Sequence, residues 1–228
     1  MAKFLNSLEE NNQFIKMTED KYFVDKSKLV SELNNLVGSA KQYVCITRPR
    51  RFGKSINALM LASYYSKNLD TKNIFDNLNV ANSPSYEKHL HKHNVIFMSF
   101  NTRNLKLSSY ESYRDYFIDG LVEDLKEICP DLDANNPIST IFDYVYSKTK
   151  EGFIFIIDEW DYIFNKHMFE DAEDRDKNKK DFLDFLENLL KDKSYVEFAY
   201  MTGILPIAKY FSTSFCNMFD EYNMMTDD

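Results

Sequence analysis

The sequence predicts an α/β fold in which helices cover both faces of a mainly parallel β-sheet. Short apolar runs, of the kind found in strands that are buried on both faces, recur along the chain. Amphipathic segments with helical spacing separate these runs, and such alternation is typical of parallel sheets. The 228 residues, of which 44% are apolar, are enough for one domain with a substantial core.

A helix is predicted before the first strand, within YFVDKSKLVSELNNLVG at residues 22–38. Asp25 or Ser27 can cap its start, and Gly38 suits its end. Its apolar positions recur at helical spacing: Leu29, Leu33, Leu36 and Val37.

The first predicted strand, YVCIT at residues 43–47, enters a basic loop, and a helix begins at Lys54. The side chains expected to face inward from this helix are Ile56, Leu59, Met60 and Tyr64. A strand, a loop and a helix therefore follow one another.

The middle of the chain predicts a strand and two helices. The strand is VIFMSFN at residues 95–101, and the second helix fits residues 138–148. The first helix ends before Pro130, because proline disfavours helical conformation in the residue before it. Its apolar stripe consists of Tyr113, Phe117, Leu121, Leu125 and Ile128.

The last predicted strands are FIFII at residues 153–157, which leads into DEWD at 158–161, and VEFAYMT at 196–202. Between them, EDAEDRD at residues 170–176 predicts a solvated loop. An amphipathic helix follows that loop, with the stripe Phe182, Phe185, Leu186, Leu189 and Leu190.

The basic loop, RPRRFGKS, carries the closing half of the phosphate-loop pattern GxxxxGK[ST], with Arg48 in place of the first glycine. In such loops, consecutive backbone N–H groups and a helix N-terminus face the phosphates, a lysine contacts the outer phosphates, and a hydroxyl reaches Mg²⁺. A bare GKS triplet is equally compatible with an ordinary helix start. The predicted nucleotide contacts are Arg48, Pro49, Arg50, Arg51, Phe52, Gly53, Lys54, Ser55 and Ile56.

Two carboxylates, Asp158 and Glu159, end a buried strand about a hundred residues after this loop. Phosphate-loop ATPases need one carboxylate at such a strand end for Mg²⁺ and often a second one that polarises the attacking water. The two features together predict a P-loop NTPase with three α/β/α layers.

Four motifs occur in order along the chain: YFVDKS, TRPRRFGKS, the strand into DEWD, and YMTGILPIAKY. This combination resembles the predicted AAA-ATPase-like family of prokaryotic proteins, in which a P-loop NTPase domain commonly precedes a PD-(D/E)XK nuclease-like domain. The RPRRFGK form of the loop is usual in that family, so Arg48 is a family trait. The resemblance implies ATP and Mg²⁺ as ligands.

The resemblance also implies roles for single residues. Lys54 would contact the β- and γ-phosphates, and Ser55 and Asp158 would hold Mg²⁺. Glu159 would activate water as the catalytic base. Thr202, at the end of the last strand, matches the polar sensor position.

Some residues keep two interpretations. Arg50 and Arg51 are either solvated loop charges or contacts that stabilise phosphate charge. Asp161 can orient Glu159, although an exposed turn carboxylate is the simpler interpretation.

The N-terminal motif is also open to two interpretations. Tyr22, Phe23 and Asp25 border the adenine if they follow the family pattern, or they are core aromatics and a helix cap. The histidines of HLHKH, residues 89–93, would share one face on a strand, but a loop is a simpler account than a metal site.

Composition excludes several classes of partner. The net charge of -8 argues against a broad nucleic-acid-binding face. Cys45, Cys129 and Cys216 lie far apart without a CxxC pair, so we expect reduced, buried thiols and neither a disulfide framework nor a zinc site. There is no membrane-spanning run and no secretory signal, which predicts a cytoplasmic protein without a membrane partner.

We expect one AAA-ATPase-like domain over residues 1–228, with an N-terminal segment at 1–40, a core at 41–205 and the start of a truncated C-terminal region at 206–228. Against the family pattern, we expect the helical lid and the nuclease-like domain to be missing, either because the natural protein is short or because the sequence is cut at the domain boundary. Beyond ATP, the expected partners are a second copy of the chain or a separate nuclease-like or other effector domain.

The predicted function is Mg-dependent ATP binding with slow hydrolysis that regulates or assembles such a partner. One alternative is a nucleotide-binding scaffold without meaningful hydrolysis, which the missing lid favours. A second alternative is a phosphotransferase of the nucleotide-kinase type, which would need an arginine-rich lid. No arginine follows Arg175.

Overall fold

The computed structural model describes residues 2–101, 109–164 and 174–223. A sheet of five strands in the order β2-β3-β4-β1-β5 lies at its centre, and neighbouring strands are parallel throughout. The strands are β1 (Tyr43–Thr47), β2 (Asn94–Ser99), β3 (Phe153–Asp158), β4 (Val196–Gly203) and β5 (Asp220–Tyr222). The predicted α/β fold with a parallel sheet is confirmed.

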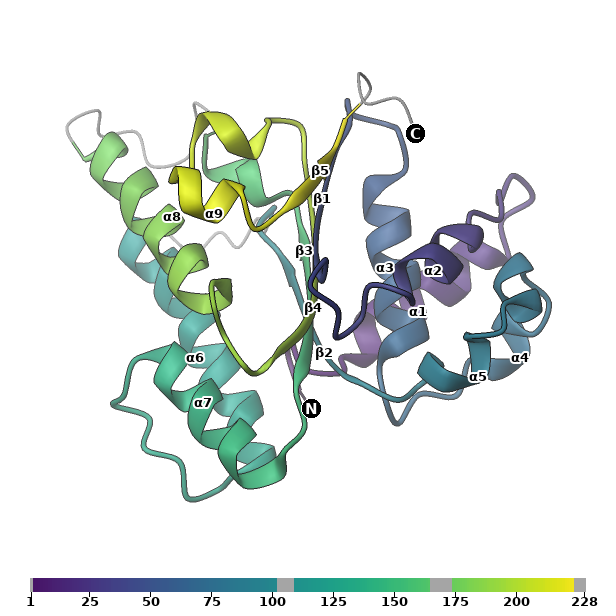
Figure 1. Ribbon diagram of the computed structural model, residues 1–228, viewed down its shortest axis with the longest axis horizontal. Helices are drawn as coiled ribbons and strands as arrows, with labels where there is room; N and C mark the ends of the chain where they lie inside the picture. The colour runs from purple at the N-terminus through teal and green to yellow at the C-terminus, as the bar shows by residue number, and fades with distance from the viewer. Residues whose placement is uncertain (1, 102–108, 165–173, 224–228) are drawn as a thin grey trace.

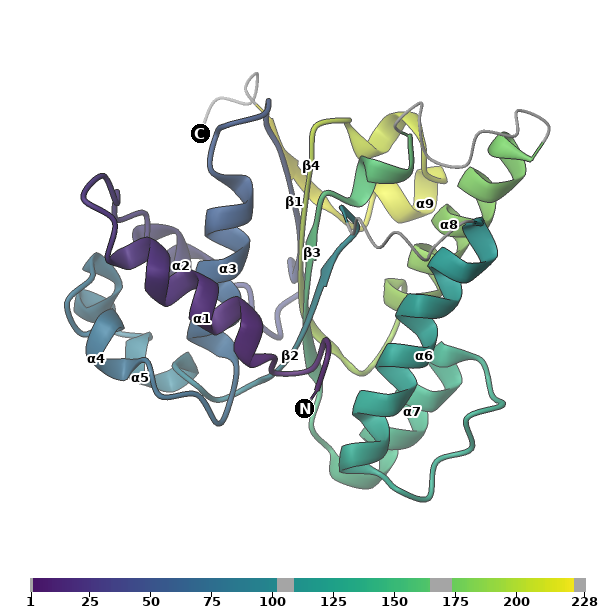
Figure 2. The same ribbon diagram turned by 180° about the vertical axis from the view of Figure 1, so that it is seen from behind.

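Helices form a layer on each side of the sheet. Figures 1 and 2 show α1 to α5 on one face and α6 to α9 on the other. The α-helices are α1 (Leu8–Thr18), α2 (Lys28–Leu33), α3 (Lys54–Tyr65), α4 (Lys72–Phe75), α5 (Tyr86–His89), α6 (Tyr110–Ile128), α7 (Ile138–Thr149), α8 (Arg175–Leu190) and α9 (Thr213–Cys216). Short 3₁₀ helices are η1 (Asn79–Asn82), η2 (Trp160–Phe164) and η3 (Ile207–Lys209).

Alternate residues of each strand divide between two hydrophobic cores. In β3, Ile154 and Ile156 belong to the core under α1 to α5, whereas Phe155 and Ile157 belong to the core under α6 to α9. Successive side chains of a strand point to opposite faces, so an apolar run supplies both cores at once. This is why each interior strand is largely a continuous run of apolar residues instead of an alternation of apolar and polar residues.

All the strands that the sequence predicts are present, and β5 adds one more. Its residues, Asp220–Tyr222, pair with β1 at the edge of the sheet, and they are only partly buried or exposed. A short polar edge strand lacks the apolar run that identifies an interior strand.

Helix α1 is an addition to the predicted elements. The Ser7 hydroxyl caps it by accepting a hydrogen bond from the Glu9 N–H at 3.2 Å. Its buried residues are Asn11 and Phe14, so its apolar face is too narrow to give a clear helical period.

The helix predicted within residues 22–38 is shorter than expected. It ends at Leu33 as α2, and turns continue to Gly38, which has a φ of 70°. The two residues expected as caps bind η1 instead: the Asp25 carboxylate accepts from the Asn79 N–H, and the Ser27 hydroxyl accepts from the Val80 N–H.

Two further expectations differ from the structure. Ile56 was expected to face inward but is 40% exposed, because the first turn of α3 faces the basic loop and a cavity beside it. Helix α8 already begins at Arg175, within the acidic segment expected as a loop, and residues 170–173 of that segment lie outside the described residues. The three cysteines are free thiols, and Cys216 is partly exposed.

The N-terminal segment extends the sheet at the β2 edge. Leu5 forms an antiparallel bridge with Ile96 of β2. The buried carboxylate of Asp124, on α6, accepts hydrogen bonds from the backbone N–H groups of Lys3, Phe4 and Leu5 at 2.8, 2.6 and 2.9 Å. The segment that leads into α1 is therefore held from the opposite face of the sheet.

Within the described part of the chain, no helix combines the length and apolarity needed to cross a membrane.

Candidate functional site

The basic loop lies between the carboxyl end of β1 and the start of α3. Gly53 caps α3 with a φ of 79°, and Arg51 also has a positive φ, 70°. Left-handed residues between right-handed ones turn successive N–H groups toward one side, which makes an anion-binding concavity. Two left-handed residues, Arg51 and Gly53, therefore lie close together at the start of α3.

Lys54 lies inside this loop and is only 9% exposed. Its ammonium donates to the carbonyl oxygens of Arg48 at 2.8 Å and Pro49 at 3.0 Å. Each of these carbonyls is a neutral partner, so a phosphate that enters the loop would offer the ammonium a stronger, charge-assisted hydrogen bond.

Arg48 contacts the carboxyl ends of two neighbouring strands, β1 and β4. Its N–H donates to the Gly203 carbonyl of β4 at 3.1 Å, and its guanidinium donates to the Thr47 carbonyl at 3.2 Å. Arg48 therefore acts as a backbone link between the loop and β4 in this structure. The next residues of the loop, Arg50 and Arg51, are exposed.

The carboxylates after β3 contact the end of β4 through one hydroxyl. Thr202 Oγ1 donates to Asp158 Oδ1 and accepts from the Glu159 N–H at 3.3 Å. Asp158 is 4% exposed and Thr202 is fully buried. One threonine thus joins the two carboxylate residues that the sequence analysis assigns to metal binding and water activation.

Glu159 has two unusual properties. Its φ is 53°, a conformation that residues with a Cβ atom adopt at an energetic cost. Burial raises the pKa of its carboxyl group above the ordinary value, and the charges of Asp158 and Asp161 raise it further, while Lys54 and Arg50 oppose the shift. A carboxylate with a raised pKa on a residue with strained backbone is typical of a functional site.

Asp161 does not lie in an exposed turn, which was the simpler interpretation of the sequence. It is 8% exposed, and its Oδ2 accepts from the N–H groups of Ile204 and Leu205, both at 2.9 Å. The backbone after β4 folds over this carboxylate because its N–H groups need an acceptor there. Asp161 therefore anchors the segment that follows Thr202.

A cavity of about 470 Å³ brings the two halves of the site together. Ser55, Asp158 and Glu159 all line it, as do Glu9 and Glu10 of α1. Mg²⁺ in nucleotide sites is usually held by one or two carboxylates together with phosphate oxygens and water. The hydroxyl of Ser55 and the carboxylate of Asp158 are hard oxygen donors facing one space, so these residues fit the ion.

The structure contains no complete metal cage among the residues that it describes, since no group of three or more His, Cys, Asp or Glu side chains could hold an ion there. A magnesium ion in the 470 Å³ cavity would therefore depend on phosphate oxygens as additional ligands.

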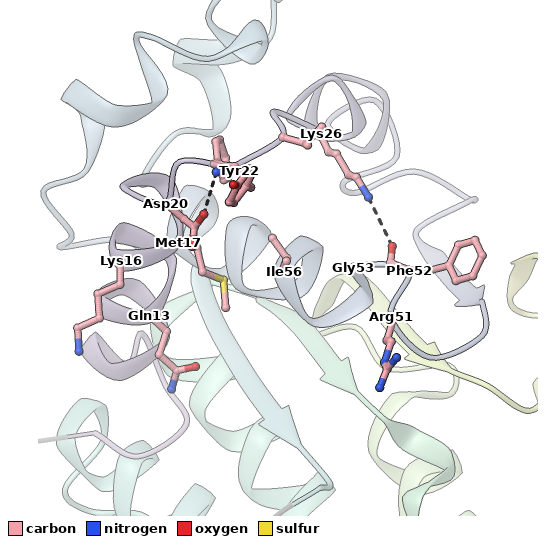
Figure 3. Close-up of a pocket in the computed structure, with 12 residues that line it drawn as sticks. Gln13, Lys16, Met17, Asp20, Tyr22, Lys26, Arg51, Phe52, Gly53 and Ile56 are labelled. Atoms are coloured by element: carbon pink, nitrogen blue, oxygen red, sulfur yellow. Dashed lines mark hydrogen bonds between the residues drawn. The ribbon is translucent and has the colours of Figure 1, made fainter.

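A second cavity, of about 690 Å³, lies beside the first, since Gln13 of α1 lines both (Figure 3). Gly53 and Phe52 of the loop line it together with Tyr22, which is 81% exposed. Phe23 also lines this cavity, but Asp25 instead binds η1. Of the motif expected to border an adenine, the two aromatic residues are therefore placed beside the loop.

The histidines of HLHKH do not share one strand face. His89 Nδ1 lies 3.0 Å from His93 Nε2, and His93 Nδ1 lies 2.8 Å from a carboxylate oxygen of Glu197, whereas His91 contacts Thr71. These contacts link α5 to the starts of β2 and β4. They are internal hydrogen bonds and form no metal site.

Two further residues near the candidate site were not predicted from the sequence. Lys26 lines the larger cavity and touches the loop backbone, and Glu10 faces the smaller cavity from α1. Lys26 lies within the YFVDKS motif, which was the available signal. Ser7 followed by Glu10 is a capping-box pattern that would have predicted α1.

Comparison with known families gives one match. Residues 11–211 match a family model described as "Predicted AAA-ATPase". A comparison with curated proteins finds no match. The matched range contains both the basic loop and the carboxylates after β3.

Proposed function

Since the chain belongs to the predicted AAA-ATPase family, we propose that it binds ATP with Mg²⁺ and hydrolyses the nucleotide slowly. One observation carries the proposal: Ser55, the last residue of the basic loop, shares a cavity with Asp158 and Glu159, which come from a strand about a hundred residues away. This proximity supports the proposal, because phosphoryl transfer uses a phosphate loop together with carboxylates.

The phosphate loop supplies the contacts for binding. The N–H groups at the start of α3 and the helix dipole favour the negative charge of the phosphates. Lys54 exchanges its bonds to the Arg48 and Pro49 carbonyls for bonds to the outer phosphates. The base lies in the 690 Å³ cavity, whose lining includes exposed apolar side chains such as Tyr22 and Ile56.

Ser55 and Asp158 are the residues that would hold Mg²⁺, which neutralises phosphate charge when it is bound. Glu159, with its raised pKa, accepts a proton from the attacking water. The hydroxyl of Thr202 holds Asp158 in place and fixes the backbone of Glu159.

Hydrolysis of this kind serves a partner in our proposal, either a second copy of the chain or a separate nuclease-like or other effector domain. Ile204 supports this part of the proposal, because a partner that contacts Ile204 can respond to changes at the nucleotide site. Ile204 is 42% exposed, and its N–H donates to Asp161. It follows closely after Thr202, whose hydroxyl donates to Asp158.

Calorimetric titration with ATP, in the presence and absence of Mg²⁺, tests the proposal. We expect Lys54→Ala to abolish measurable binding, because the main phosphate contact is lost. We expect Asp158→Asn to weaken binding much more with Mg²⁺ than without it, since the carboxylate serves the ion.

Equal losses for Asp158→Asn under both conditions would contradict the metal assignment, and unchanged affinity of Lys54→Ala would contradict the phosphate-loop assignment. Competition with GTP checks the base: ATP should bind more tightly. Binding of ATP without any phosphate release would support a nucleotide-binding scaffold instead of an ATPase.

A further inference from the structure

The side chain of Lys26 reaches the phosphate loop from outside. Its ammonium lies 3.4 Å from the carbonyl oxygen of Phe52, the contact drawn as a dashed line in Figure 3. A Cβ atom placed on Gly53 would lie 3.1 Å from the same ammonium. Lys26 therefore lies directly against the peptide group that joins Phe52 to Gly53.

The backbone around Lys26 is fixed on both sides. The carboxylate of Asp25 accepts from the Ser27 N–H at 2.8 Å and from the Asn79 N–H at 2.7 Å. Ser27 is fully buried, and its hydroxyl accepts from the Val80 N–H at 3.0 Å. These bonds tie the neighbours of Lys26 to η1, so its side chain extends toward the loop from a rigid base.

The contact fixes the direction of one peptide group. In a planar trans peptide, the carbonyl and the following N–H point in opposite directions. When the Phe52 carbonyl faces Lys26, the Gly53 N–H faces away from Lys26. The opposite orientation would turn a carbonyl oxygen toward the phosphates and repel them.

Gly53 makes this orientation easy to lose. Glycine has no Cβ and populates both signs of φ about equally, so the peptide before it can rotate at little steric cost. Gly53 has a φ of 79° here, and negative values of φ are also open to it. An outside hydrogen-bond donor is needed to select the conformation that binds phosphate.

We propose that Lys26 is a positioning residue for phosphate binding: its ammonium holds the Phe52–Gly53 peptide with the Gly53 N–H directed at the phosphates. The inference rests on the proposed nucleotide site and adds a second lysine to it. Lys26 acts through the backbone, whereas Lys54 contacts the phosphates themselves.

Calorimetric titration with Mg-tripolyphosphate, which has no base and so contacts only the loop and the residues that would hold Mg²⁺, tests this role. We expect Lys26→Met to weaken binding about tenfold, the effect of one lost charge-assisted contact. Lys26→Arg keeps a charged donor and should retain most of the affinity. Lys26 is exposed, so both variants should unfold at the same temperature as the parent chain.

Lys16 provides the matched control. It is an exposed lysine that lines the same cavity, on α1, and Lys16→Met removes the same charge from the same surroundings. We expect a loss of less than about twofold, the level of a screened surface charge. Equal losses for Lys16→Met and Lys26→Met would show a general charge effect and overturn the inference.

The amide NMR signal of Gly53 gives a second readout. It should shift in Lys26→Met and return toward the parent position in Lys26→Arg, because only the donor to Phe52 differs. If Lys54→Ala loses tripolyphosphate while Lys26→Met binds it like the parent, the inference fails and the proposed function stands. If Lys54→Ala also binds like the parent, the proposed function fails.

Discussion

Glu159 shows how a single residue is prepared for proton transfer. It follows the buried Asp158, and its carboxyl group is flanked by a second acidic side chain, Asp161. Burial and these two like charges disfavour the ionised form, so the pKa of Glu159 lies above its ordinary value of 4.5. A base with a raised pKa takes up a proton more readily once it is ionised.

The raised pKa predicts an acid limb in the pH profile of ATP hydrolysis. Only ionised Glu159 accepts a proton. As the pH is lowered, the rate of hydrolysis should therefore fall around the raised pKa of Glu159, which lies above 4.5. The measurement is phosphate release as a function of pH at saturating ATP. Glu159→Gln should keep ATP bound and lose most of the hydrolysis, and the remainder should lack this limb.

The same shift predicts an effect on stability. A carboxyl group whose pKa is higher in the folded than in the unfolded protein destabilises the fold when it is ionised, and the penalty disappears as the pH falls through the folded pKa. Glu159→Gln should therefore raise the free energy of unfolding at pH 7, measured with urea. A variant that is both less stable and fully active would contradict both assignments.

At the scale of elements, the N-terminal segment depends on one carboxylate. Asp124 of α6 is 3% exposed and binds three backbone N–H groups of residues 3–5 across the edge of the sheet. This segment leads into α1, whose Glu10 lines the cavity of the candidate site. The position of α1 is therefore coupled to α6 on the opposite face.

Removing this carboxylate should release the segment. We expect Asp124→Ala to lower the free energy of unfolding by about 3 kcal/mol, because two buried donors and one partly buried donor lose their acceptor. Urea unfolding measures the loss, and hydrogen exchange should become faster at residues 3–6. Asp119→Ala, an exposed position on the same helix, is the control and should change stability by less than about 0.5 kcal/mol.

The elements that the sequence predicts well are those whose evidence is local. The run FIFII and the stripe that ends before Pro130 produce β3 and α6 because burial and backbone restriction act within a few residues. Strand β5 escapes prediction because it is stabilised mainly by pairing with β1, which is distant in the chain. Helix α1 leaves one local signal, the pattern of Ser7 followed by Glu10, but its apolar face is too narrow to give a helical period.

The candidate site divides in the same way. Gly53, Lys54 and Asp158 are recognisable because a phosphate loop and a carboxylate at a strand end leave a short pattern. Asp161 and Lys26 are harder to recognise, although Lys26 belongs to the YFVDKS motif, because their roles depend on backbone groups of residues that are remote in sequence, Ile204 for the first and Phe52 for the second.

At the scale of the whole molecule, the arginines that would act on the nucleotide are concentrated on one element, the basic loop. In the proposed nucleotide site, three arginines, Arg48, Arg50 and Arg51, all belong to the basic loop itself. Arg114 lies on α6 and pairs with Asp115. Charge placed against the developing negative oxygens from the side opposite the loop is a main source of rate in phosphoryl transfer.

This distribution predicts slow turnover. We expect the chain alone to bind ATP and to hydrolyse it well below the roughly 1 to 100 per second typical of kinases. Steady-state phosphate release measures the rate. A partner that supplies an arginine should accelerate it by up to about 10³ to 10⁵. Turnover by the isolated chain within the kinase range would contradict this view of the site.

The division of each strand between two cores also decides which residues can reach the nucleotide. Asp158 stands two positions after Ile156, and Thr202 stands two positions after Tyr200. Because Ile156 and Tyr200 belong to the core under α3, the side chains of Asp158 and Thr202 point to that same face of the sheet. Ser55 lies on this face too. One inserted residue in β3 would send the carboxylate to the opposite face, and a second would bring it back. These strands can therefore change length without losing the site only in steps of two residues.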